Sequence, residues 1–274
     1  MKTLIDSKSV NRLQLSEIFR FRDLLWNLSM RDVLIRYKQT FVGVAWAVIR
    51  PLVNIVIFGF LAQFIEQSPN ITLKFMQVSA GVIIWGLISS SINDASNSVI
   101  SNANILTKVY FPKLIIPIAS LTVCLIDFLI SFAILFILRI VFMGLPGPEI
   151  FLLPVFITYA LIFSFSVGLY FSALNVKFRD VKFVIPFLLQ IGFYVVPVFL
   201  STSFYLQKLP VFLKPLFLLN PLVTIVEGFK YAFLGDTFSV PAMYVAGGVL
   251  LTFLLFLLSI RYFVKFEKTF TDII

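Results

Sequence analysis

Polar and aromatic side chains recur at helical spacing within three otherwise apolar segments of the sequence. Spacings of three or four residues place each set on one face of a helix. Amide, hydroxyl and aromatic groups on such faces can hydrogen-bond to a polar ligand and stack against it. We therefore predict a polar, aromatic-lined path between helices, lined by Trp46, Arg50 and Asn54, by Trp85, Ser89 and Asn93, and by Phe187, Gln190 and Tyr194.

The same side chains allow a second interpretation, in which they only hold a helical bundle together. Interhelical hydrogen bonds in membranes contribute about 0.6 kcal/mol on average. A charge at the bilayer centre costs ~2.5–3.5 kcal/mol, so it normally faces protein or water. Asp127 and Arg50 fit either role. Most of the 33 phenylalanines are expected to pack against helices or lipid, although a few, with Trp46 and Tyr194, could stack on sugar rings.

Several chemistries are excluded by residues that the sequence lacks. It has no histidine and a single cysteine, Cys124, so neither a zinc or haem site nor an intrachain disulfide is expected. The nearest match to a GxxxxGK[ST] phosphate loop runs from Gly81 to Gly86 and continues with Leu87. We expect no catalytic residue, metal or cofactor in this chain, and any ATP would be hydrolysed by another protein.

The composition is that of a membrane protein. Hydrophobic residues make up 60% of the 274 and charged residues 13%, against ~45–50% and ~25% in soluble domains, and the mean hydropathy is +1.02. A spanning helix needs about 20 apolar residues. We predict an all-α integral membrane protein with six transmembrane helices at roughly 41–65, 77–100, 114–142, 150–174, 182–201 and 239–264.

The connection 202–238, before the last predicted span, is apolar but contains charged residues and the prolines Pro210, Pro215 and Pro221. Broken backbone at membrane depth must be covered by protein or water. We therefore expect short helices that lie at the outer face or re-enter the membrane.

Lysine and arginine gather in residues 1–40, in two connections between spans and in the C-terminal tail. The opposite side carries only Lys74, Lys208, Lys214 and Lys230. By the positive-inside rule both termini are cytoplasmic, as an even number of spans requires. Because these charges separate apolar runs and do not cover a folded domain, nucleic-acid binding is not expected.

Residues 1–40 are predicted to form a cytoplasmic N-terminus, and residues 41–274 a single transmembrane domain. No cleaved signal peptide is expected. Within 16–38 an amphipathic helix would lie in the membrane interface, in contact with lipid, or would dock a partner. The pattern from Ser29 to Asp32 resembles a capping box and predicts that a second helix starts there. The apolar face consists of Phe21, Leu24, Leu25 and Leu28.

Four motifs, in order along the chain, resemble the membrane subunit of ABC-2-type exporters, in the group that exports polysaccharides and polyol phosphates (O-antigen, capsule and teichoic acid permeases). Each motif alone is weak, but four in order at matching topological positions are specific. Together with the amphipathic start and the six spans, the resemblance covers nearly the whole chain. The motifs are Arg31-Asp32 with Arg36-Tyr37, Thr40, Gly43, Trp46 and Arg50-Pro51; Asn102 to Lys113; Asn175 to Val181 with Arg179-Asp180; and Leu219-Asn220-Pro221 with Gly228 and Tyr231.

The resemblance implies a homodimer in the bacterial plasma (inner) membrane, with two cytoplasmic ATPase subunits that bind ATP and magnesium. A lipid-linked polysaccharide, as in lipopolysaccharide biosynthesis, would pass between the two copies. It also implies that Arg31, Asp32, Arg36, Asn104, Lys108, Tyr110 and Lys113 couple to the ATPase. The outer gate would contain Asn220, Pro221 and Glu227.

Two alternatives stay open at this point. An ABC-2 exporter of a small molecule or lipid would share the fold and the partner, but explains the Arg31 to Tyr37 motif less readily. A membrane-embedded lipid-linked sugar transferase would need acidic or histidine residues gathered at one membrane face. Asp94 and Asp127 are expected to be too isolated to form such a cluster.

Overall fold

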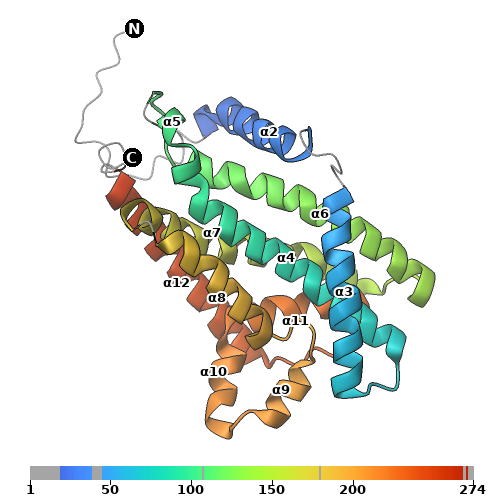
Figure 1. Cartoon of the computed structure of the whole chain (residues 1–274). Helices are drawn as coiled ribbons and strands as arrows, with labels where there is room; N and C mark the ends of the chain where they lie inside the picture. Colours follow the sequence, from blue (N-terminus) through green and yellow to red (C-terminus); the bar gives the residue numbers. More distant parts are fainter. Residues whose placement is uncertain (1–18, 39–44, 107, 179, 268–269, 271–274) are drawn as a thin grey trace.

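The computed structural model describes residues 19–38, 45–106, 108–178, 180–267 and 270, without the side chains of 46–48 and 50. The described residues form helices and connecting turns with no β-strand, which confirms the all-α prediction. Long helices pack side by side, and the short helices within residues 202–234 gather at one end of the bundle (Figure 1).

Within the described residues, four helical segments are long and apolar enough to cross a membrane. They correspond to the second, third, fourth and sixth predicted spans. The first and fifth correspond to helices with shorter apolar stretches, α3 (Ala45–Glu66) and α8 (Val181–Val195). The six-span count therefore stays a prediction. The four segments are α4 (Ile71–Ser101), α6 (Ile115–Met143), the 3-10 turn η2 (Pro148–Leu152) continuing into α7 (Leu153–Lys177), and α12 (Ala242–Glu267).

Helix α8 ends earlier than the predicted boundary at residue 201. Pro197 explains this difference, because proline has no N–H and disfavours helical backbone in the residue before it. Val196 accordingly has extended angles, φ −88° and ψ 147°. The residues from Val196 to Leu200 continue as a buried, non-helical segment.

Residues 202–238 contain short helices, as predicted. The junction at Asn220 is a helix start, because the Asn220 side chain accepts a hydrogen bond from the Leu222 N–H at 3.0 Å and Pro221 occupies the first turn. Here the apolar segment Val211–Leu219 meets Pro221–Leu234 at 72°, which is the geometry of a broken span or a re-entrant loop. The helices are α9 (Thr202–Lys208), η3 (Val211–Leu213), α10 (Lys214–Leu219) and α11 (Pro221–Leu234).

Helix α4 is the central helix and packs against α3, α6, α7 and α11. Small residues allow the close contact with α7. A Cβ added at Gly168 would lie 2.6 Å from the Cβ of Ala95, so only glycine fits at that crossing. Most of α4 is buried, and it can therefore hold polar side chains between its neighbours.

Helix α2 (Arg22–Lys38) lies along α6. Its predicted apolar face is confirmed, since Leu28 is buried and Phe21, Leu24 and Leu25 pack against the same core cluster as Ile116 and Ala119 of α6. The predicted helix start at Ser29 is wrong. The helix is continuous there, and the buried Ser29 hydroxyl donates a hydrogen bond to Thr122 Oγ1 at 3.3 Å.

Candidate functional site

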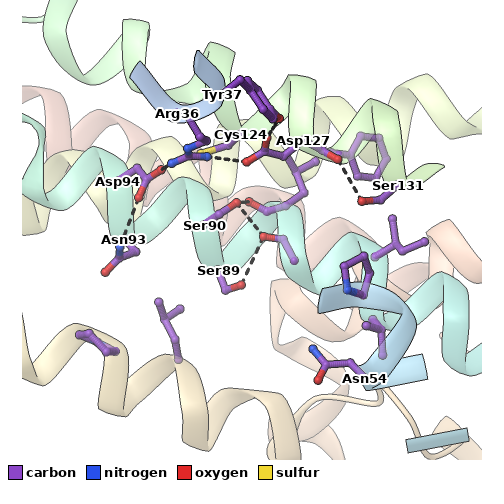
Figure 2. A pocket seen from close by; sticks show the side chains of 18 residues that line it. Arg36, Tyr37, Asn54, Ser89, Ser90, Asn93, Asp94, Cys124, Asp127 and Ser131 are labelled. Carbon is purple, nitrogen blue, oxygen red and sulfur yellow. Dashed lines mark hydrogen bonds and ion pairs between the residues drawn. The ribbon is translucent and has the colours of Figure 1, made fainter. Parts of the chain in front are cut away.

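A cavity of about 860 Å³ lies between α2, α3, α4, α6 and α8. Figure 2 shows polar side chains from α2, α4 and α6 gathered on one side, with Asn54 of α3 opposite them. The polar lining residues are Arg36, Tyr37, Asn54, Ser89, Ser90, Asn93, Asp94, Cys124, Asp127 and Ser131.

Arg36 joins three helices at this cavity. From the last turn of α2, its guanidinium contacts Asp94 Oδ2 of α4 at 2.6 Å and Asp127 Oδ2 of α6 at 2.5 Å. The three side chains are only 25–37% exposed. Because a guanidinium presents several donors in one plane, a single side chain can hold both carboxylates.

Neighbouring groups complete what we call the Arg36 cluster, defined as Arg36, Tyr37, Asp94 and Asp127. The Tyr37 hydroxyl donates to Asp127 Oδ1, and the Asn93 amide donates to Asp94 Oδ1 at 3.2 Å. Burial alone would lower the pKa of Arg36, but the two carboxylates raise it above its ordinary value. Burial and the bond to Asp127 raise the pKa of Tyr37. Both groups therefore remain protonated at neutral pH.

Only some of the residues predicted to line a path lie at the cavity. Asn54, Ser89 and Asn93 line the cavity. Trp85 is buried, with its ring 6.2 Å from that of Phe193. On α8, Pro186 and Leu189 line the cavity, whereas Phe187, Gln190 and Tyr194 are exposed on the surface of the chain. The side chains of Trp46 and Arg50 lie outside the described part.

The residues assigned to ATPase coupling also have different surroundings. Arg36 belongs to the cavity. Arg31 donates to Asp32 at 2.6 Å and to Asn102 at 2.7 Å, which ties α2 to the end of α4. Lys113 donates to the Glu267 carbonyl at 2.6 Å. The exposed residues are Asn104 on the short helix α5 (Ala103–Leu106), and Lys108 and Tyr110 after it.

At the other end of the bundle, buried charges hold the short helices against α3 and α4. Lys74 pairs with Glu66 at 2.7 Å, and Glu66 also accepts from the Ser201 N–H at 2.6 Å. Glu227, from the predicted outer gate, accepts from the Thr202 hydroxyl at 2.8 Å. Lys230 donates to the Pro197 carbonyl at 2.5 Å. Asn220 and Pro221 begin α11 as described above.

The Arg36 cluster is the feature that the sequence analysis missed. Asp94 and Asp127 were expected to be isolated, and this expectation is wrong because Arg36 contacts both. The available signal was an arginine near the end of an amphipathic helix together with one aspartate in each of two apolar segments. Charges in such segments usually have partners, but the sequence does not show which helices are neighbours.

Comparison with known proteins agrees with this architecture. A family model described as ABC-2 type transporter matches residues 23–234. The chain is 26% identical over 220 residues to an O-antigen export system permease protein RfbA of Myxococcus xanthus, covering 79% of this chain and 82% of the relative. It is 25% identical over 263 residues to a protein of the same name from Klebsiella pneumoniae, covering 92% and 95%. The chain, a multi-pass membrane protein by its helices, belongs to the ABC-2 type transporter family.

Proposed function

We propose that the chain is the permease subunit of an ATP-driven exporter that moves a long, lipid-linked, O-antigen-like polysaccharide across the plasma membrane. The names of the Myxococcus and Klebsiella relatives support this class of cargo. The cavity at the Arg36 cluster is the observation that carries the proposal, because it brings hydroxyl-binding groups together inside a membrane domain.

The lining of this cavity suits a sugar. Carboxylate oxygens of Asp94 and Asp127 and the amides of Asn54 and Asn93 can exchange hydrogen bonds with sugar hydroxyls. The cavity volume of about 860 Å³ falls in the range of ~300–1,000 Å³ typical of ligand pockets. Several hydrogen-bond donors and acceptors, distributed over α2, α3, α4 and α6, suit a polymer that must slide through the site.

The proposed assembly is a homodimer with two ATPase subunits on the cytoplasmic side. Six spans with both termini cytoplasmic would place α5 and the following residues Lys108 to Lys113 against the ATPase. The exposed stripe Phe187, Gln190 and Tyr194 on α8 would face the path between the two copies. Exposed aromatic rings in such a path can stack on sugar faces without fixing the polymer at one position along the path.

The deciding experiment is deletion of the gene combined with purification of the tagged chain alongside the ABC ATPase of the same cell. We expect a stoichiometric complex with ATPase activity, and lipid-linked glycan retained inside the deletion strain. A complex without retained glycan would favour a small-molecule or lipid exporter. If no ATPase associates with the chain, the proposal is wrong.

Reversing the charge of Lys108 is expected to weaken ATPase association. Lys108 is exposed beyond α5, so Lys108→Glu would change an interface and leave the bundle intact. We expect at least a tenfold loss of co-purified ATPase, which corresponds to a binding free energy weakened by about 1.4 kcal/mol. Membrane insertion should be unchanged. Lys208→Glu, on α9 at the other end, is the control. Equal ATPase recovery in both variants would contradict the coupling role.

Removing the Tyr194 ring is expected to reduce export more than assembly. Its side chain is 53% exposed, while its carbonyl, which the mutation preserves, accepts a hydrogen bond from Tyr205 at 2.6 Å. Aromatic contacts contribute about 0.5–1.5 kcal/mol each, so Tyr194→Ala should slow glycan export roughly threefold to tenfold. The measurement compares surface glycan with the amount of assembled complex. Parallel losses of both would indicate a packing role only.

A further inference from the structure

Basic side chains and aromatic rings gather where α7 and α12 end and α8 begins. We call this surface the basic–aromatic patch. Its four described cations are all exposed. The patch consists of Lys177, Lys182, Arg261 and Lys265, with the rings of Tyr170, Phe178, Phe183, Tyr262 and Phe266.

The rings form a continuous connection between α7 and α12. The Tyr170 and Tyr262 centroids are 4.8 Å apart, and those of Tyr262 and Phe266 are 4.6 Å apart. Lys177 continues the connection, with its Nζ 5.8 Å from the centroid of Phe266. Arg261 and Lys265 each precede one of these rings on α12, so they flank the aromatic seam.

Two cations of the patch lie over aromatic rings. Lys177 Nζ lies 5.0 Å from the Phe178 ring centroid, and Lys182 Nζ lies 4.8 Å from that of Phe183. Among the described residues, none of the four cations forms an ion pair, although Asp180 lies nearby in the chain. Glu267, also on α12, instead binds Lys113 through its carbonyl and its carboxylate.

We propose that the basic–aromatic patch binds the phosphate headgroup of an anionic phospholipid of the surrounding membrane. Helices α7 and α12 are long enough to span a bilayer, so their ends reach the headgroup region. Tyrosine rings are enriched at that depth, and each lysine or arginine near an anionic surface strengthens binding. The patch combines both with charge that no described protein group neutralises. The inference does not depend on the cargo.

The test uses the full chain, purified from membranes and placed in vesicles of mixed phosphatidylglycerol and phosphatidylcholine. After extraction, mass spectrometry measures the phosphatidylglycerol retained by the protein. We expect enrichment over the bulk lipid, and roughly a twenty-five-fold loss of affinity for Lys177→Gln with Lys265→Gln, about fivefold for each cation. Lys208→Gln with Lys214→Gln removes the same charge from the α9–α10 region and should retain the lipid.

Three outcomes would overturn the inference. One is equal retention of phosphatidylglycerol by the wild type and the Lys177, Lys265 variant. Another is equal loss in both double variants, which would show a general charge effect. The third is loss of the co-purified ATPase with retained lipid, which would make the patch a protein-docking surface. Surface glycan, measured in the same strains, reports separately on the exporter proposal.

Discussion

Arg36→Met is expected to detach the end of α2 from the bundle and to abolish export. The substitution leaves Asp94 and Asp127 facing one cavity without the cation that joins them. Breaking a buried ion pair by removing one partner costs ~3–5 kcal/mol. Partial exposure reduces this cost to about 2 kcal/mol, which corresponds to a drop of roughly 4–8 °C in the midpoint of thermal unfolding.

Two further variants separate the effect of the Arg36 charge from the effect of its packing. Lys38→Met removes an exposed cation from the same helix end and should change neither stability nor export. Arg36→Met combined with Asp94→Asn and Asp127→Asn removes all three charges, so it should recover most of the stability. If export stays absent in this triple variant, the charged groups act on the cargo or the coupling. A normal unfolding midpoint in Arg36→Met alone would show that the ion pairs do not hold α2.

Much of the fold follows from local properties of the sequence. The apolar face of α2 was predictable from Leu24, Leu25 and Leu28, because helical periodicity is a local signal and its burial is a direct consequence. The long apolar helices were predictable for the same reason, since their length and hydropathy need no tertiary information. The end of α8 could have been placed earlier from Pro197 alone.

The candidate site was less predictable, because it depends on which helices become neighbours. Asn54, Ser89 and Asn93 were found from their spacing, since a polar side chain on a mostly apolar helix needs polar surroundings. The grouping of Arg36 with Asp94 and Asp127 was not found. The residues are 58 and 91 positions from Arg36, and helical periodicity gives no contact between separate helices.

Gly81→Ala is expected to displace the buried segment that follows α8. A Cβ at this position of α4 would lie 2.0 Å from the Val198 carbonyl oxygen and 2.9 Å from Lys230 Cε. Backbone cannot rotate away as a side chain can, so the segment must move. Overpacking of this kind costs about 1–3 kcal/mol. The movement also strains the bond from Lys230 to the neighbouring Pro197 carbonyl, so the effect should lie at the upper end.

Gly86→Ala is the matched control for this prediction, because it makes the same change on the same helix. A Cβ there meets nothing within 4 Å, and alanine favours helix over glycine by ~0.5–1 kcal/mol. We therefore expect Gly81→Ala to lower the midpoint of thermal unfolding and to impair export, while Gly86→Ala leaves the midpoint unchanged or raises it. Equal unfolding midpoints in the two variants would show that the segment from Val196 to Leu200 can move without loss of stability. The contact at Gly81 would then not hold α9 to α11 in place.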